Sequence, residues 1–247
     1  RAHSVHPPAP SGVDPQVKRF WKTTAVVPGE AGFGVALDGR PVRTPARAAL
    51  TVPTPALAEA IAAEWDAQDE TINPRAMPLT GLTNAAIDRV THDREAFAAR
   101  LAAYGESELI AYRADGPASL VAAQAAAWDP WVAWLARRHD AALMITTGIL
   151  HVAQPPATLQ RLQAAFAAFD PFHLTPLDPV VTITGSAVLA LAVAEGELDA
   201  ETAYDVAHVD ARWQEEHWGR DELAAKAEAT RRADLASAVA FLRLLAG

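Results

Sequence analysis

Hydrophobic and polar positions follow a strand-like pattern only near the start of the chain. The stretch RFWKTTAVV (19–27) is dense in aromatic and β-branched residues, and FGVAL (33–37) follows it after a PGEAG turn. Asp38-Gly39 is a pair typical of tight hairpins, so RPVRT (40–44) is expected to return as a third strand. Leu50-Thr51-Val52 adds a short fourth candidate. The pattern predicts a small antiparallel sheet.

The hydrophobic period becomes helical at Thr54. Threonine is a good N-cap residue and Pro55 suits the first helical turn, before the apolar stripe of ALAEAIAAEWDAQ. A short sheet needs its apolar face covered, so we expect this helix to lie across the sheet. Trp65 is then expected to pack the helix onto the strands.

Helical periods dominate from residue 77 onward. The segments 109–113 and 143–149 are expected to be extended, and a break or kink is expected at Asp129-Pro130. The expected helices cover residues 77–90, 93–104, 117–141, 156–169, 175–195, 199–218 and 220–246. The sequence therefore predicts an α+β fold. A flexible, proline-rich tail (1–17) precedes a small sheet domain covered by a helix (18–76), and a larger all-α domain (77–247) follows.

Composition narrows the possible partners. The chain has 247 residues, 51% of them hydrophobic, and a net charge of −9, which suits a soluble globular protein and disfavours nucleic acid as a partner. It has no cysteine, so disulfides, thiolate nucleophiles and cysteine-based metal sites are excluded. The most apolar stretch, Val180 to Ala194, is shorter than the roughly 20 residues that span a bilayer, so we expect a buried core helix and no membrane insertion.

Familiar catalytic motifs are not matched. GEAGFG (29–34) lacks the spacing of a phosphate-binding loop and leads into a strand. Ser186 in TGSAV lacks the second glycine of a nucleophile elbow and is interpreted as a packing serine. Bulky rings at helical spacing among alanines favour core positions, and this interpretation applies to Trp65, Trp128, Trp131 and Trp134.

One dense constellation remains, in VDARWQEEHWGRDE (209–222). Spacings of 4, 3 and 4 place Asp210, Gln214, His217 and Asp221 on one helical stripe, flanked by Trp213 and Trp218. Asp210, His217 and Asp221 could bind a divalent cation, which leaves a metal-dependent hydrolase as an alternative. Metal sites usually draw ligands from more than one element, however, so a protein-recognition face is favoured. Whether Trp213 and Trp218 belong to a core or an interface stays open.

Several motifs together resemble a known family. They are, in order, RFWKTTAVV, DGRPVRTP, TVPTPALAEAIAAEWDAQ, MPLTGLTNAAID, YRA, WDPWxxW and DARWQEEHWG. Their sequence and spacing over about residues 18–225 resemble the assembly chaperones of the F-type ATP synthase catalytic head that attend the α subunit. The chain differs from that family in its alanine-rich, charged final helix.

The resemblance implies a non-enzymatic chaperone without a cofactor, which keeps the free α subunit ready for assembly. It implies that Asp210, eight positions before Trp218-Gly219, is a charge partner for the client, although some members carry glutamate there. The partner-binding residues expected are Asp210, Trp213, Gln214, His217, Trp218 and Asp221. We expect a monomer in the bacterial cytoplasm, or in the mitochondrial matrix of a eukaryote. A subunit that stays in the finished ATP synthase is a further alternative.

Overall fold

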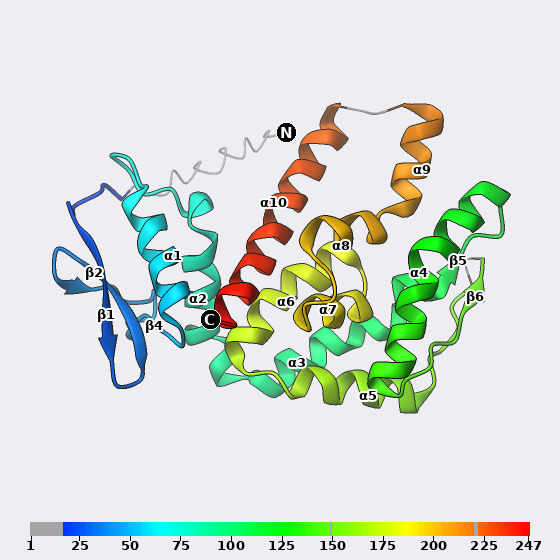
Figure 1. Cartoon of the computed structure of the whole chain (residues 1–247), viewed down its shortest axis with the longest axis horizontal. Coiled ribbons are helices and arrows are strands. Elements are labelled where there is room, and N and C mark those ends of the chain that lie inside the picture. Colours follow the sequence, from blue (N-terminus) through cyan, green and yellow to red (C-terminus); the bar gives the residue numbers. More distant parts are fainter. Residues whose placement is uncertain (1–16, 149, 220–221) are drawn as a thin grey trace, which may run out of the picture.

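The computed structural model describes residues 17–148, 150–219 and 222–247. A small antiparallel sheet at one end of the molecule is followed by a larger array of helices (Figure 1). The predicted fold class, a helix-covered sheet followed by an all-α part, is confirmed. Of the predicted tail, residues 1–16 lie outside the described residues.

The sheet is built around one central strand. Its strands are β1 (Thr24–Gly29), β2 (Gly32–Leu37), β3 (Arg40–Pro41) and β4 (Thr51–Val52). β2 pairs antiparallel with each of the other three. β1 begins later than predicted. The backbone amides of Lys22 and Thr23 donate hydrogen bonds to the Asp38 carboxylate and not to the backbone carbonyls of a neighbouring strand. The third strand is shorter than expected, because its ladder with β2 ends at Pro41 and Arg43 instead forms an isolated bridge with Ala49.

Helix α1 (Pro55–Asp66) covers one face of this sheet, as predicted. The Thr54 hydroxyl accepts a hydrogen bond from the Leu57 amide at 3.2 Å, which confirms the N-cap, and Leu57 and Ile61 are buried. Trp65 packs edge-on against the buried Trp21, with 5.2 Å between ring centroids. The predicted role of Trp65 in packing the helix onto the sheet domain is therefore confirmed.

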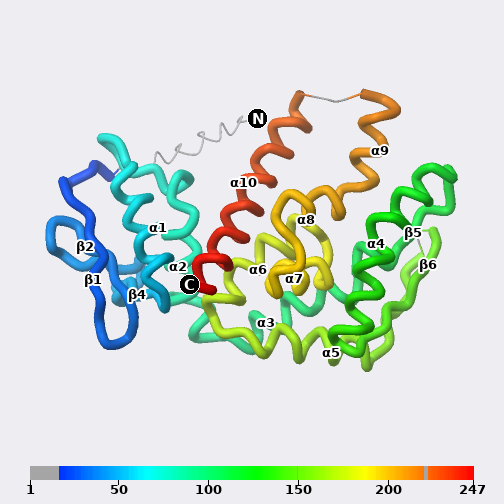
Figure 2. Tube along the Cα trace, viewed as in Figure 1, coloured from blue at the N-terminus to red at the C-terminus, as the bar shows by residue number. Residues whose placement is uncertain are grey.

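The remaining elements form the helical part, which Figure 2 traces in sequence order. Short 3-10 turns occur at η1 (Pro74–Ala76), η2 (Val90–His92), η3 (Ala103–Ser107) and η4 (Leu109–Ala111). β5 (Tyr112–Arg113) and β6 (Thr146–Thr147) form a parallel pair. The helices are α2 (Pro78–Asp88), α3 (Arg94–Ala102), α4 (Ala118–His139), α5 (Pro156–Ala167), α6 (Pro171–Thr184), α7 (Ala187–Ala194), α8 (Ala200–Ala207), α9 (Val209–Trp218) and α10 (Glu222–Leu245).

Two predicted helices are each divided in the structure, and one predicted break is absent. The helix expected over 175–195 is two helices, because Gly185 adopts a φ of 66° and the Ser186 hydroxyl caps α7 through the Leu189 amide. The helix expected over 199–218 is interrupted at His208. By contrast, α4 continues through Pro130, where a break or kink was predicted. Trp128 and Trp134 are buried on either side of that proline, so packing outweighs the local preference.

The final helix packs against both the helical core and the N-terminal sheet domain. Phe241 of α10 is buried in the core cluster of the sheet domain, together with Trp21, Leu57 and Ile61. The Thr54 hydroxyl also donates to the Leu244 carbonyl at 2.6 Å. In Figure 1 the C-terminus accordingly lies beside α1 and α2. The domain boundary expected at residues 76–77 stays a prediction.

A buried carboxyl group lies at the N-terminus of α7. Glu108 has no exposed surface, and its carboxylate accepts a hydrogen bond from the Val188 amide at 3.2 Å. Burial raises the pKa of Glu108 to about 7, although hydrogen bonds from Ser186 and Val188 oppose the shift. The ionisation of this core residue therefore couples folding to pH near neutrality.

The stretch Val180 to Ala194 is largely buried within the helical core, where α7 is apolar on every side. Its role as core, predicted from its length, is confirmed, although it spans two helices. Over residues 17–148, 150–219 and 222–247, no helix is both long and apolar enough to cross a bilayer.

Candidate functional site

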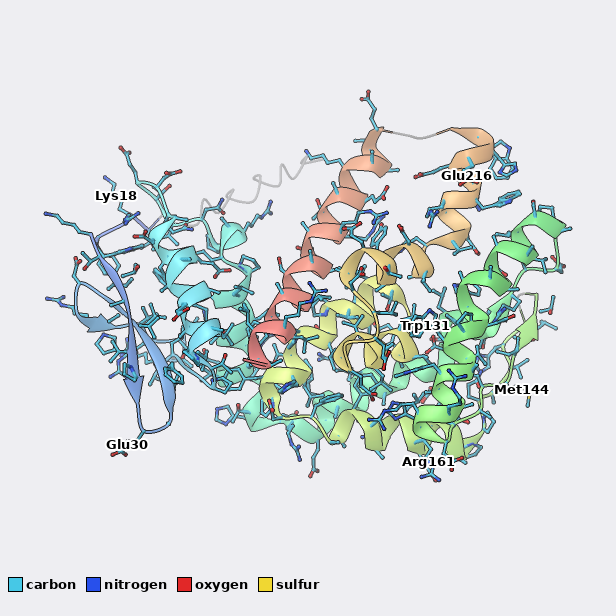
Figure 3. The ribbon with its side chains drawn as sticks, viewed as in Figure 1. Lys18, Glu30, Trp131, Met144, Arg161 and Glu216 are labelled. Carbon is cyan, nitrogen blue, oxygen red and sulfur yellow. The ribbon has the colours of Figure 1, made fainter. Side chains whose placement is uncertain are left out.

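Helix α9 carries five of the six predicted site residues. It begins after His208 and ends at Gly219, where φ is 86°. The helix packs against α4, as Figures 1 and 3 show. Asp221 lies outside the described residues.

Asp210 is exposed but held in place. Its carboxylate accepts a hydrogen bond from the Gln124 side-chain amide at 2.7 Å. Gln124, on α4, is only 2% exposed, and its amide oxygen accepts from the Ala114 backbone amide at 2.8 Å. A buried amide held at both ends restricts the rotamers of Asp210, so a negative charge is presented to solvent in one orientation.

Two tryptophans and a histidine form an aromatic group on the same helix. Trp213 is half-buried and its indole N–H donates to the Ser119 hydroxyl at 3.0 Å. His217 stacks on Trp213 with 4.0 Å between ring centroids, and Trp218 meets Trp213 edge-on at 5.7 Å. Trp218 is 74% exposed. Trp213 therefore anchors α9 to α4, while Trp218 leaves a large apolar ring in solvent, accompanied by the exposed Gln214 and His217.

Charged and aromatic contacts hold α8 and its junction with the N-terminal end of α9. Arg232 of α10 forms ion pairs with Glu201 at 2.6 Å and with Asp205 at 2.8 Å, both on α8. His208, between α8 and α9, stacks on Tyr204 with 3.9 Å between ring centroids. Burial lowers the pKa of His208, although its hydrogen bond to the Tyr204 carbonyl opposes the shift. The bend between the two helices is thus well packed, which fixes the direction of α9.

A shallow hollow lies between α4 and α9. Its volume is about 330 Å³, and it is lined by Ala123, Ala126, Ala127, Val209, Arg212, Trp213 and Glu216. The lining is mostly apolar, with small alanines of α4 and the Trp213 ring, and it includes two charged side chains, Arg212 and Glu216. A lining of this mixed character is typical of surfaces that contact other proteins.

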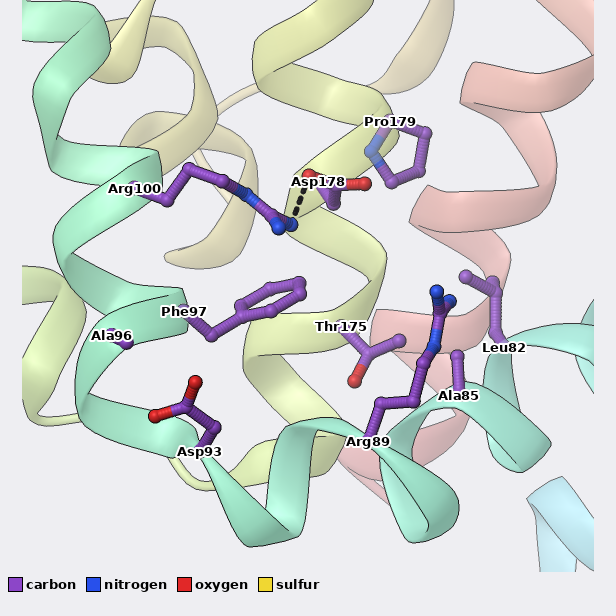
Figure 4. A pocket seen from close by; sticks show the side chains of 10 residues that line it. All are labelled: Leu82, Ala85, Arg89, Asp93, Ala96, Phe97, Arg100, Thr175, Asp178 and Pro179. Atoms are coloured by element: carbon purple, nitrogen blue, oxygen red, sulfur yellow. Dashed lines mark hydrogen bonds and ion pairs between the residues drawn. The ribbon is translucent and has the colours of Figure 1, made fainter. Parts of the chain in front are cut away.

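Another hollow, of about 570 Å³, lies between α2, α3 and α6 (Figure 4). Arg100 pairs with Asp178 at 2.9 Å and lies over the Phe97 ring at 4.4 Å from its centroid. The lining of this hollow contains Arg89 and Arg100 together with Asp93 and Asp178, so neither positive nor negative charge dominates it. The hollow does not include any predicted site residue.

The metal interpretation of the constellation has no support from the described side chains. Within residues 17–148, 150–219 and 222–247, no three His, Cys, Asp or Glu side chains are placed to hold a metal ion. Asp210 is bound to an amide, and His217 donates its Nδ1 hydrogen to the Trp213 carbonyl at 2.7 Å.

Known proteins are similar to this chain over most of its length. It matches the ATP12 chaperone protein family over residues 18–136. The crystal structure of Atp12 from Paracoccus denitrificans is 45% identical and covers 93% of this chain and 98% of its own, with a TM-score of 0.89. The chain belongs to the ATP12 chaperone family. A structure from Agrobacterium tumefaciens is 39% identical, with a TM-score of 0.88, and covers 92% of this chain and 86% of its own.

The ATP12 relationship extends to eukaryotes. The mitochondrial protein atp12 of Schizosaccharomyces pombe is 24% identical over 217 residues, which are 83% of this chain and 75% of the relative. The resemblance predicted from the motifs is thus confirmed, and so is the prediction of a chaperone of ATP synthase assembly rather than an enzyme. The hydrolase alternative is wrong on this evidence. The individual binding residues stay predictions.

Two polar residues of α4 were missed from the sequence. Gln124 orients Asp210, and Ser119 accepts the Trp213 indole hydrogen bond. A glutamine within the apolar run LVAAQAAAW was a possible signal, because a buried amide requires hydrogen-bond partners. The identity of the partner, 86 residues away, was not visible in the local pattern.

Proposed function

We propose that this ATP12-family chaperone binds the free α subunit of the F-type ATP synthase catalytic head through the exposed face of α9. The proposed contact residues are Asp210, Trp213, Gln214, His217 and Trp218, with Asp221 outside the described residues. The observation that carries the proposal is the exposed Asp210 carboxylate, held by the buried Gln124, on the same helix as the exposed Trp218 ring.

This combination suits a client that still exposes its subunit interfaces. An unassembled ring subunit presents apolar surface made for burial, and such surface promotes aggregation. The Trp218 ring offers an apolar anchor, because tryptophan is enriched among residues that dominate binding energy. Asp210, with its orientation fixed before binding, provides a charge partner at low entropic cost. The proposed client surface therefore combines an apolar patch with a basic side chain.

The chaperone must also release its client when the true partner subunit competes. A moderate interface with a charged rim allows this exchange better than a large apolar one. The net charge of −9 supports the solubility of a complex with an aggregation-prone client. We propose that the chaperone acts as a monomer in the bacterial cytoplasm, or in the mitochondrial matrix of a eukaryote.

Charge reversal at Asp210 should weaken client binding. Asp210→Lys is expected to raise the dissociation constant for purified α subunit at least about tenfold, because it opposes the client's basic group. Asp210→Asn keeps an acceptor for Gln124 while removing the charge, so an intermediate loss is expected. The measurement is suppression of α-subunit light scattering over a range of chaperone concentrations.

Asp69→Lys provides the matched control, since this exposed aspartate lies between α1 and η1 and undergoes the same change of charge. It is expected to behave like the wild type. Equal protection of the α subunit by Asp210→Lys and wild-type protein would exclude Asp210 from the contact. Failure of the wild type itself to protect or bind the α subunit would contradict the proposed function.

Replacing Trp218 with alanine should weaken binding of the α subunit while leaving the stability of the chaperone almost unchanged. Because the ring is 74% exposed, Trp218→Ala is expected to change the free energy of unfolding by less than about 0.5 kcal/mol. Binding to the α subunit should weaken about tenfold or more, as for an interface anchor. Unfolding in denaturant and titration calorimetry measure the two effects. Unchanged affinity would show that Trp218 lies outside the interface.

A further inference from the structure

A long uncharged connection joins α4 to α5, at the end of the molecule opposite the sheet (Figure 1). Residues 141–160 contain no aspartate, glutamate, lysine or arginine, although these residues make up 21% of the chain. In the described part of the connection, residues 140–148 and 150–155, β6 is the only regular element. Connections longer than about 12–15 residues are uncommon in compact domains and frequently act as binding loops.

The connection exposes large apolar side chains, namely those of Met144, Ile145 and Leu150. Single exposed apolar residues are common on folded proteins. A group of them without interspersed charge is instead typical of a surface that contacts another molecule. Methionine suits such a contact, because its flexible side chain adapts to the shape of the partner.

Hydrogen bonds hold the backbone of this connection in place. Gln154 is only 4% exposed, and its side-chain amide binds both backbone polar groups of Met144. The Gln154 oxygen accepts from the Met144 amide at 2.8 Å, and the Gln154 nitrogen donates to the Met144 carbonyl at 3.0 Å. The Thr158 hydroxyl also donates to the Ala142 carbonyl at 2.5 Å. A backbone that is fixed before binding lowers the entropic cost of a contact through the exposed side chains.

The connection is linked to the proposed binding face on α9 through β5. β6 pairs with β5, which ends at Arg113. The next residue, Ala114, donates its amide to the Gln124 side-chain oxygen, and the nitrogen of that side chain binds the Asp210 carboxylate. In Figure 3, Met144 lies at the same end of the molecule as α9. The apolar side chains and the Asp210 carboxylate are therefore available to one partner.

From this geometry we infer that Met144, Ile145 and Leu150 form a second contact for the α subunit, which covers uncharged apolar surface beside the basic group that pairs with Asp210. This inference rests on the proposed function. An unassembled ring subunit exposes apolar surface of this kind, and an uncharged contact leaves no unpaired charge buried against it. Two moderate contacts give combined affinity while each can be displaced separately.

The charge of the molecule argues against the two other occupants of an exposed apolar segment, a second copy of the chain and a membrane. With a net charge of −9, two copies repel each other, and an anionic membrane surface repels each copy. Residues 141–160 also offer no lysine or arginine to bind lipid headgroups. A protein that combines apolar surface with a basic group complements both the apolar side chains and Asp210.

Replacing the apolar side chains with polar ones of similar shape tests the second contact. Met144→Gln/Ile145→Thr is expected to weaken binding of purified α subunit about tenfold in titration calorimetry. The variant buries less apolar surface on binding, so its heat-capacity change of binding should be less negative than that of the wild type. Because both residues are exposed, its melting temperature should stay within about 2 °C of the wild type.

Val27→Thr is the matched control for Ile145→Thr, since Val27 is also exposed and β-branched but lies in the sheet, at the opposite end of the molecule (Figure 1). The affinity of Val27→Thr should stay within about twofold of the wild type. Leu150→Ser gives an independent variant if the double variant folds poorly, and it is expected to weaken binding about threefold.

If the wild type binds the α subunit and Met144→Gln/Ile145→Thr and Leu150→Ser bind it equally well, the second contact is wrong while the proposed function stands. If the wild type does not bind the α subunit, the proposed function is wrong and the second contact with it.

Flotation with vesicles that contain anionic phospholipid, and light scattering of the chaperone alone, test the other two occupants. The inference predicts that the wild type neither floats with the vesicles nor forms dimers. Flotation or dimerisation that Met144→Gln/Ile145→Thr abolishes, together with unchanged affinity for the α subunit, would overturn the inference.

Discussion

Replacing Trp128 with alanine is expected to lower the free energy of unfolding by about 3–5 kcal/mol. Trp128 is 1% exposed, and its indole N–H donates to the Val206 carbonyl in α8 at 2.7 Å. The substitution removes a large buried ring and leaves a cavity, and it also leaves this carbonyl without its indole donor. Denaturant unfolding followed by circular dichroism measures the loss.

Trp218→Ala is the control for the Trp128 prediction, because the same side chain is removed from an exposed position. A loss below about 1 kcal/mol for Trp128→Ala would contradict its place at the centre of the helical core. Trp128→Phe retains most of the packing but not the hydrogen bond, so an intermediate loss is expected. Because Trp128 joins α4 to α8, just before α9, Trp128→Ala should also weaken α-subunit binding in protein that remains folded.

Stability should fall as pH rises through the range in which Glu108 ionises. The pKa of Glu108 is about 7 in the folded protein, against an ordinary value of 4.5. The folded state thus holds the proton more tightly, and the stabilisation is complete below pH 4.5 and lost as pH rises through 7. The difference corresponds to about 3 kcal/mol.

Glu108→Gln tests this dependence, because glutamine has a similar shape and does not ionise. The free energy of unfolding is measured in denaturant at intervals from pH 4.5 to 8 for both proteins. The wild type should lose about 3 kcal/mol relative to Glu108→Gln across this range. Parallel curves for the two proteins would show that Glu108 keeps its ordinary pKa in the fold.

Features set by neighbouring residues were predictable from the sequence. The start of α1 follows from Thr54 and Pro55, since capping involves only the next few residues. The hairpin at Asp38-Gly39 follows from the positive φ that both residues adopt. The single helix expected over 175–195 was wrong because apolar residues continue across Gly185, and a fully buried stretch has no polar face to mark its break.

Features set by distant residues were not predictable. The apolar pattern of α4 does not indicate that Gln124 orients Asp210, and nothing near Trp213 indicates its bond to Ser119. Similarly, the position of Gly34 between Val27 and Thr51 requires the strand register. The constellation on α9 was recognisable as a group of residue types, but its geometry depends on tertiary contacts that a single sequence does not reveal.

The most direct measurement is the mass of the species formed when purified chaperone and purified free α subunit are mixed. Size-exclusion chromatography with light scattering should give a one-to-one complex for the wild type and for Asp69→Lys. The complex should be largely lost for Asp210→Lys, with its circular dichroism spectrum unchanged. Separate elution of the wild-type chaperone and the α subunit would contradict the account, because a chaperone for free α must bind it before assembly.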